Sequence, residues 1–342
     1  GAPISGQSRV VISSKSPLTG GIGTSEAGGF WPAEAKATGY DAFIIRGKAP
    51  KPVYLYVHDE TIEIREASKI WGLKTGDSEK WIRNSLGDNR IQILQIGPAG
   101  ENLVRYAAVM NMCNRANGRT GMGAVMGSKN LKAIAVRGTK KTNISNPTAL
   151  RKLARWGVEN LETSAAIFTA QYGTASVTGS LHGRGGLVTR NWSSGVYEHF
   201  KDLTGQKMSE TILVKRDTCY ACVLKCKRVV EVKDVDPQVD PIYGGPEFET
   251  IAMFGSACDI HDLKVIAQIN QLCNAYGIDT ITTGGIAAWL MELFETGIIT
   301  SKDTAGFSIK FGDSQGVIEL VEIIAKRKGF GNDAAEGVEY LS

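Results

Sequence analysis

Ala133-Ile134-Ala135-Val136-Arg137 is a short apolar run with β-branched residues, the composition typical of a buried strand. It is the last of several such runs in the first 140 residues, each bounded by Gly, Pro or Asn. The pattern then changes, because Pro147 opens a stretch, Thr148–Ser164, with helical periodicity. The earlier strand-like runs are Arg9–Ser13, Ala42–Arg46, Val53–His58 and Ile91–Ile96.

Strands at this spacing, with few long helical patterns between them, favour an antiparallel sandwich or barrel over a parallel sheet. The later sequence is helical: Asp262–Tyr276 and Gly284–Glu295 both have helical patterns, the second with one apolar stripe. We therefore predict an α+β fold. An N-terminal antiparallel β-sandwich-like domain would span residues 1–143, and a mainly α-helical domain would span residues 144–342.

The composition excludes several classes of function. Of the 342 residues 42% are hydrophobic, the net charge is only +4, and no Lys/Arg run forms a basic arm, so we predict no nucleic-acid partner. No apolar stretch reaches the length of a membrane span and no signal peptide opens the chain, which favours a cytoplasmic protein. The first and last residues, Gly1 and Ser342, are interpreted as cuts from a longer protein.

Three of the six cysteines lie within eight residues, in Cys219-Tyr-Ala-Cys222-Val-Leu-Lys-Cys226. Such crowding is unusual for a disulfide framework and typical of a metal or iron–sulfur site in a reducing compartment. A [4Fe–4S] cluster needs four such thiolates, zinc is the rival ligand, and three buried cysteines without metal are the third alternative. The remaining cysteines, at 113, 258 and 273, are interpreted as core residues.

A glycine-rich stretch, Gly121-Met-Gly123-Ala-Val-Met126-Gly127, follows two arginines, Arg115 and Arg119. The dinucleotide motif is excluded because Met126 stands where its third glycine would be, and no acid follows about twenty residues on. Two interpretations remain. The backbone could lie against a flat or anionic ligand that the arginines bind, or the stretch is a glycine turn beside solvated arginines.

Carboxylates and an amide mark two further candidate sites. Glu249, in Gly244-Gly-Pro-Glu-Phe-Glu249-Thr250, stands at a helix start, where it is either a dipole partner or a proton acceptor near a redox centre. Asn274 lies near a helix end that Gly277 would close, and Asp279 could cap the next helix.

Taken together, these segments resemble the aldehyde ferredoxin oxidoreductase family, whose sequence blocks occur here in family order. Only residues from about 140 to 215 match weakly. The matching blocks are Lys15–Gly20, Ala27–Phe30, Thr38–Ala42, Ile96–Val104, Gly121–Gly138, the cysteine cluster, Gly245–Glu249 and Gly277–Gly285.

The resemblance implies a tungsten bis-pterin centre (molybdenum in some members), one [4Fe–4S] cluster and a Mg²⁺ ion that joins the pterin phosphates. Three cysteines match cluster ligands, and Glu249 matches the acid near the metal. The cluster ligands would be Cys219, Cys222 and Cys226, and the cofactor-binding positions would be Arg9, Glu26, Ala27, Gly28, Arg115, Ala116, Gly118, Arg119, Asn274 and Asp279.

Two positions depart from the aldehyde branch of the family. Glu26 stands where that branch has Asn, near the magnesium and phosphate region, and Asn274 stands where it has Asp. The resemblance also implies that the family's third domain, with the fourth cluster cysteine and much of the substrate channel, lies outside these residues. These departures leave the substrate branch open.

The expected activity is the oxidation of an aldehyde, a small molecule, to a carboxylic acid. Glu249 would relay a proton, and the cluster would pass electrons singly to ferredoxin or a related electron-transfer subunit. The family also suggests a homo-oligomer or a larger complex. The alternatives are a hydroxycarboxylate oxidoreductase, the aryl-CoA-reducing subunit, and a non-catalytic iron–sulfur or zinc module.

Overall fold

A computed structural model describes all residues, 1–342, and the chain packs into two compact units that are interleaved along the sequence. The first unit comprises residues 1–167, 218–225 and 274–277, and the second comprises 168–217, 226–273 and 278–342. The domain division predicted between 143 and 144 stays a prediction.

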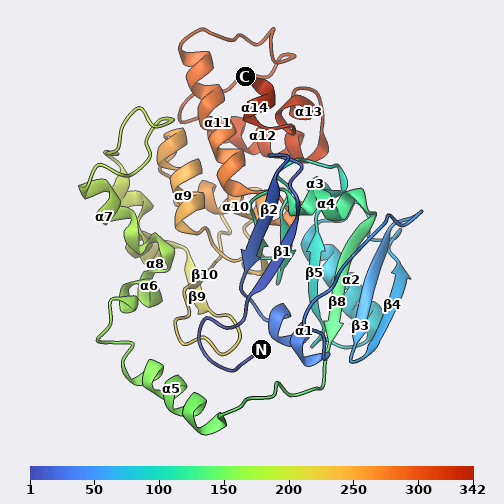
Figure 1. Cartoon of the computed structure of the whole chain (residues 1–342). Helices are drawn as coiled ribbons and strands as arrows, with labels where there is room; N and C mark the ends of the chain where they lie inside the picture. Colours follow the sequence, from blue (N-terminus) through green and yellow to red (C-terminus); the bar gives the residue numbers. More distant parts are fainter. The chain divides into compact units, whose positions relative to one another are not determined.

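The first unit contains a six-stranded sheet with the strand order β4-β3-β8-β5-β6-β7 (Figure 1). A separate hairpin of β1 and β2 begins the chain, with Val10 opposite Ala27. The strands are β1 (Val10–Lys15), β2 (Ile22–Ala27), β3 (Val53–His58), β4 (Thr61–Glu66), β5 (Gln92–Ile96), β6 (Val109–Asn111), β7 (Arg115–Asn117) and β8 (Leu131–Arg137).

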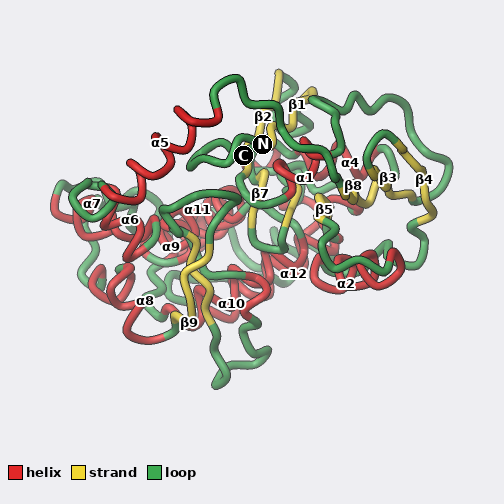
Figure 2. Tube along the Cα trace, turned by 90° about the horizontal axis from the view of Figure 1, so that it is seen from below, coloured by secondary structure: helices red, strands yellow, loops and turns green.

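Both faces of this sheet are covered, because its central strands are apolar on alternate sides. Ile134 and Val136 of β8 join the core under α1 and α4, whereas Ala133 and Ala135 join the core under α2. Figure 2 shows α2 on the opposite side of the sheet from α1 and α4. The helices of this unit are α1 (Trp31–Ala37), α2 (Thr75–Leu86), α3 (Pro98–Glu101), α4 (Met122–Ser128) and α5 (Pro147–Glu159), and α6 (Ala166–Tyr172) begins here.

The second unit is mainly helical, with one two-stranded ribbon in which β10 pairs antiparallel with β9. Its strands are β9 (Leu213–Asp217) and β10 (Lys227–Val230), and its helices are α7 (Thr178–Gly183), α8 (Gly205–Thr211), α9 (Phe248–Phe254), α10 (Leu263–Tyr276), α11 (Thr280–Glu295), α12 (Ser314–Lys326), α13 (Gly331–Ala334) and α14 (Val338–Leu341). Short 3₁₀ helices are Thr174–Val177, Phe200–Leu203, Pro241–Tyr243 and Ser256–Cys258.

The predicted fold class is confirmed: an N-terminal sheet region is followed by a helical part. Two details are corrected. The sheet is not purely antiparallel, because β3 and β8 run parallel. Ala42–Arg46 is not a strand: Phe43 and Ile45 pack against the core and Ile44 is exposed, so the alternation there reflects packing of an unpaired segment.

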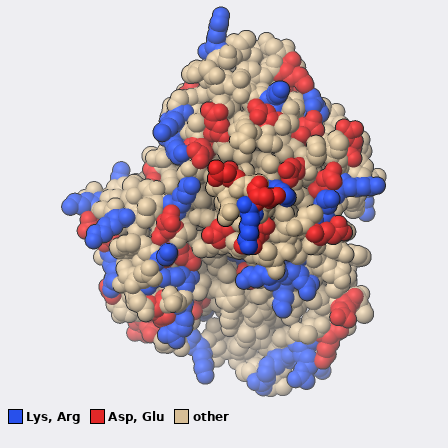
Figure 3. Space-filling model, turned by 180° about the vertical axis from the view of Figure 1, so that it is seen from behind, with Lys and Arg blue, Asp and Glu red and all other residues tan.

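None of the helices combines the length and apolar character that crossing a membrane requires. Basic and acidic side chains are both spread over the face shown in Figure 3. This mixed surface agrees with the small net charge of the chain.

Candidate cofactor-binding site

The glycines directly after β2 are buried and lie against two polar side chains of the first unit. An added Cβ on Gly28 would lie 2.7 Å from the Sγ atom of Cys219, and one on Gly29 would lie 2.1 Å from Oδ1 of Asn111. Gly29 also has a φ of +116°, which L side chains rarely adopt. Only glycine therefore allows this close approach at either position.

Hydrogen bonds hold the carbonyl groups of this glycine segment. Gly29 accepts from Ser8 Oγ at 2.6 Å and from the backbone N–H of Tyr220 at 3.2 Å. Gly28 accepts from Asn111 Nδ2 at 3.1 Å. The backbone at this point is therefore rigid, which suits a site that must bind a large ligand in one orientation.

The loop that contains Cys219 and Cys222 is built onto the first unit, although it lies about a hundred residues further along the chain. Arg115 donates to the carbonyl of Thr218 at 2.8 Å, and Val223 N donates to Ser5 Oγ at 3.1 Å. Within the loop, Thr218 Oγ1 donates to the Cys222 carbonyl at 2.6 Å. All the predicted cofactor positions except Asp279, and two predicted cluster ligands, therefore belong to the same compact unit.

The three predicted cofactor-binding arginines, of which Arg115 and Arg119 are the predicted phosphate ligands, differ in environment. Arg9 is half-exposed, its Nε lies 3.9 Å from Oε1 of Glu26, and one guanidinium nitrogen is 3.7 Å from the Cβ position of Gly28. Arg115 is only 7% exposed and also donates to Asn114 Oδ1, whereas Arg119 is exposed. Of the other predicted positions nearby, Ala27 is buried, Gly118 is half-buried and Ala116 is exposed.

The glycine-rich stretch of α4 packs against protein backbone. An added Cβ on Gly127 would lie 1.9 Å from the Gly100 carbonyl oxygen of α3, and one on Gly123 would lie 2.5 Å from the Ala108 carbonyl oxygen. Gly121, with a φ of +76°, would meet the Arg105 carbonyl oxygen at 2.0 Å. The predicted close approach is therefore present, but at these glycines it is to the protein's own chain.

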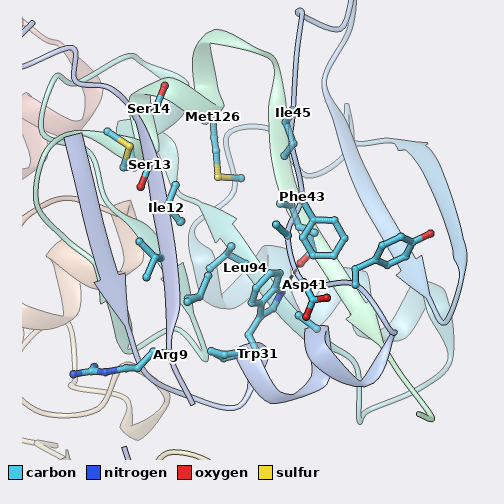
Figure 4. A pocket seen from close by; sticks show the side chains of 18 of the residues that line it. Arg9, Ile12, Ser13, Ser14, Trp31, Asp41, Phe43, Ile45, Leu94 and Met126 are labelled. Carbon is cyan, nitrogen blue, oxygen red and sulfur yellow. Dashed lines mark hydrogen bonds between the residues drawn. The ribbon is translucent and has the colours of Figure 1, made fainter. Parts of the chain in front are cut away.

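A cavity of about 500 Å³ lies in the first unit, between β1 and the large sheet (Figure 4). Its wall is mainly apolar and includes Ile12, Trp31, Phe43 and Leu94. Arg9 is the one predicted cofactor residue in its lining. Arg9 therefore lies both beside Gly28 and at this cavity, whose other lining residues are not predicted cofactor positions.

Cys226 belongs to the second unit and directly precedes β10. Its carbonyl accepts a hydrogen bond from Nε of Arg228 at 3.2 Å. The same guanidinium donates to the carbonyls of Gln171 at 2.6 Å and Ala170 at 3.2 Å, near the end of α6. Burial lowers the pKa of Arg228 from its ordinary value.

The Gly244–Thr250 segment of the second unit contains two carboxylates in different environments. Glu247 pairs with Lys227 Nζ at 3.0 Å and accepts from Thr174 Oγ1 at 2.5 Å. Glu249 is exposed in the first turn of α9. Of the two interpretations of Glu249, its place in the first turn agrees with the dipole partner, and its role as a proton acceptor stays a prediction.

The last two predicted cofactor positions lie at helix boundaries. Asn274 is buried in the first unit, and its carbonyl accepts from Thr75 Oγ1 at 2.9 Å. Asp279 is the N-cap of α11: its carboxylate accepts from the N–H groups of Ile281 and Thr282. The capping role predicted for Asp279 is confirmed, and its contact with a pterin stays a prediction.

The three remaining cysteines are buried, as predicted, and burial raises the pKa of each thiol. By contrast, Cys219, Cys222 and Cys226 are all partly exposed, and none is oxidised to a disulfide. The structure gathers no group of three or more His, Cys, Asp or Glu side chains that could hold a metal ion. The three-cysteine ligand set therefore stays a prediction.

Several polar residues of these sites were not predicted from the sequence. Ser8, Asn111 and Thr218 hold the glycine segment and the cysteine loop, but no local motif distinguishes them. Lys227 and Arg228 had a usable signal, because charged residues stand next to Val229-Val230 in a strand-like run. Such residues, when buried, need partners.

Comparison with known proteins identifies the class to which this fold and these residues belong. A family model described as aldehyde ferredoxin oxidoreductase, N-terminal domain, matches residues 1–138, and one described as domains 2 and 3 matches residues 151–342. The chain belongs to the aldehyde ferredoxin oxidoreductase family, which is a family of oxidoreductases. The family resemblance predicted from the sequence is confirmed.

The individual relatives fall into more than one branch. Tungsten-containing aldehyde ferredoxin oxidoreductases from Pyrococcus abyssi and Pyrococcus furiosus are each 42% identical over 98% of this chain. The WOR-like subunit of an aliphatic sulfonate oxidoreductase from Pyrococcus furiosus is 31% identical over 95% of it. The chain spans about 55% of the length of the curated relatives it matches.

A solved structure is also similar. It is the active site complex BamBC of benzoyl coenzyme A reductase with 1,5-dienoyl-CoA, which superposes with a TM-score of 0.80 at 28% identity. The match covers 99% of this chain and 52% of that one.

Proposed function

We propose that this protein oxidises aldehydes to carboxylic acids, and that it binds a tungsten bis-pterin cofactor and a [4Fe–4S] cluster. The single observation that carries the aldehyde branch is 42% identity to tungsten-containing aldehyde ferredoxin oxidoreductases over 98% of the chain. The relatives in other branches are less similar, at 31% and 28% identity.

The residues of the first unit fit a cofactor that carries phosphate. Gly28 and Gly29 offer backbone without side chains, and Arg9 places a guanidinium beside Gly28, an arrangement that suits anionic groups. The Glu26 carboxylate beside Arg9 is a hard oxygen ligand of the kind that Mg²⁺ prefers. When bound, the tungsten pterin would supply the two-electron oxidation and the oxygen-atom transfer.

The roles proposed for the chain's own residues rest on the family resemblance. The proposed pterin contacts lie in both units. Within the first unit, Gly28 and Arg115 contact the loop of Cys219 and Cys222. Glu249 would relay the proton, and electrons would leave through the cluster to ferredoxin or a related subunit. We also propose that the protein is cytoplasmic, which agrees with its free cysteines. We further propose that it forms a homo-oligomer or a larger complex.

The second candidate function is that of an aryl-CoA reductase, which interconverts an aryl-CoA and a cyclic dienoyl-CoA. It is considered because the superposition on the benzoyl coenzyme A reductase complex extends over 99% of this chain. The two functions differ in substrate chemistry rather than in the predicted cofactor positions. An assay that offers both substrates therefore separates them.

The test is anaerobic expression of the full-length protein with tungstate, followed by metal analysis and two assays. We expect tungsten, about four irons per protein, and reduction of a viologen dye that depends on an added aldehyde. Turnover of a cyclic dienoyl-CoA without aldehyde activity would favour the second candidate. Zinc as the only bound metal would contradict both and support a structural module.

A further inference from the structure

Two consecutive cations of the second unit, Lys227 and Arg228, are nearly inaccessible to solvent, at 7% and 1% exposure. They directly follow Cys226, a predicted cluster ligand, at the start of β10. Burying a charge is costly unless the group is paired or hydrogen-bonded. The hydrogen-bond and ion-pair partners of these two cations therefore show which segments the buried side chains hold together.

Lys227 connects the cysteine to the segment that precedes α9. Its Nζ lies 3.0 Å from Oε1 of Glu247 and 3.5 Å from the carbonyl oxygen of Gly245. Glu247 is the N-cap residue of α9, although its side chain makes no capping hydrogen bond. The Glu247 carboxylate thus forms an ion pair with Lys227 and does not cap α9.

A threonine completes this connection. Thr174 Oγ1 donates to Oε2 of Glu247 at 2.5 Å and accepts from the backbone N–H of Phe248, the first residue of α9, at 2.8 Å. Both carboxylate oxygens of Glu247 are therefore engaged. The first turn of α9, which carries Glu249, is fixed relative to Glu247 and Lys227.

Arg228 holds the same cysteine through its backbone. Arg228 donates to the carbonyls of Cys226, Gln171 and Ala170, and the Glu247 carboxylate that pairs with Lys227 also attracts the Arg228 guanidinium. Gly173 makes this possible, because an added Cβ there would lie 3.1 Å from both the Arg228 side chain and the Cys226 carbonyl oxygen.

We propose that Lys227 and Glu247 are positioning residues that fix Cys226 relative to the first turn of α9 and its Glu249, while Arg228 holds the Cys226 backbone. The proposal rests on the proposed function, because it takes Cys226 as a cluster ligand and Glu249 as the proton relay. Neither Lys227 nor Glu247 needs to touch the cluster or the substrate. They act through the geometry of the residues they join.

The experiment compares variants of the full-length protein, purified anaerobically with iron. Lys227→Met and Glu247→Gln each break the ion pair, and Lys227→Arg keeps it. Lys233→Met is the matched control, because Lys233 forms an exposed pair with Glu231 at 3.2 Å in the same unit. The readouts are the rate of iron loss to a chelator, the EPR spectrum of the reduced cluster, and the melting temperature.

We expect Lys227→Met and Glu247→Gln to lose iron about 10- to 100-fold faster, because removing a residue that orients a metal ligand lowers metal affinity by about this factor. Their EPR spectra should change in shape, Lys227→Arg should restore both readouts, and Lys233→Met should match the wild type. The double variant should lose iron no faster than the worse single variant, because both changes break one interaction.

Two results would overturn the proposal, and they differ in meaning. If folded Lys227→Met and Glu247→Gln keep the wild-type EPR spectrum and rate of iron loss, the pair serves stability alone and only this inference fails. If the wild-type protein itself holds no iron–sulfur cluster, the proposed function fails and the inference fails with it. Should Lys227→Met not fold, the nearly isosteric Glu247→Gln decides between these results.

Discussion

The contact between Gly28 and Cys219 shows how one residue can determine the position of a predicted metal ligand. Gly28 has only a hydrogen atom on the side that faces the Cys219 thiol. A methyl group in its place would lie 2.7 Å from Sγ. Tyr220, the next residue, donates its N–H to Gly29. This bond holds the backbone next to Cys219 in place, so a larger side chain at position 28 would have to turn the thiol away from its present position.

Gly28→Ala should therefore displace Cys219 and lower stability by about 1–3 kcal/mol, the usual cost of overpacking a buried site. Gly21→Ala is the matched control, since an added Cβ at this exposed turn of the same hairpin meets only Thr19 Oγ1, at 3.8 Å. Melting temperature and the alkylation rate of Cys219, followed by mass spectrometry, measure the two effects. Equal results for the two variants would show that the thiol tolerates the methyl group.

At the scale of elements, α3 and α4 pack with their backbones in contact. Gly100 and Gly127 provide the space, and the main-chain atoms that face them are the carbonyl oxygens of Gly123 and Gly100. Backbone atoms cannot rotate away as a side chain does. The buried ion pair between Glu101 at the end of α3 and Lys132 of β8 holds the same region, with side-chain exposures of 3% and 0%.

Gly127→Ala should be more harmful than a typical helical substitution, because the added methyl group would lie 1.9 Å from the Gly100 carbonyl oxygen. We expect a loss of about 3 kcal/mol or more, at or beyond the upper range for overpacked cores. Gly157→Ala in α5, where an added Cβ meets nothing within 4 Å, should instead gain up to about 1 kcal/mol of helix propensity. Urea unfolding of both variants gives the comparison; a neutral Gly127→Ala would mean that the two helices separate easily.

At the scale of the whole molecule, acid stability depends on carboxylates that are hydrogen-bonded in the folded state. Arg90 and Arg137 donate to Asp88 and hold the pKa of its carboxyl well below the ordinary value. Arg137 also donates to Glu34 of α1, so Asp88 helps to join the end of α2 to α1 and β8. A carboxyl with a lowered folded-state pKa stabilises the fold above its unfolded pKa and ceases to do so as the pH falls.

Asp88→Asn should lower the melting temperature most at neutral pH, where wild-type Asp88 is ionised in both states. The difference from the wild type should shrink as the pH falls below about 4, the ordinary pKa of an aspartic acid. Thermal unfolding of both proteins across this range is the measurement. A difference that stays constant with pH would mean that Asp88 acts through its shape and not through its charge.

Local patterns in the sequence determined the parts of this protein that depend on neighbouring residues. Val53–His58 forms β3 as predicted, and the helical periodicities correspond to α10 and α11. The order of the sequence blocks was sufficient to identify the family. Periodicity, turn residues and cysteine spacing are properties of short segments, so they can be read without knowledge of the tertiary structure.

Only the tertiary structure decided the contacts between distant segments. The parallel pairing of β3 with β8, the bond from Arg115 to Thr218, and the ion pair of Lys227 with Glu247 each join residues about 20 to 100 positions apart. The tertiary structure also decided that the glycines of α4 pack against the backbone of other segments and not against a ligand. The sequence determined which residue types are present and their local conformation, whereas burial and the partners available in the folded chain decided what each polar group and glycine does.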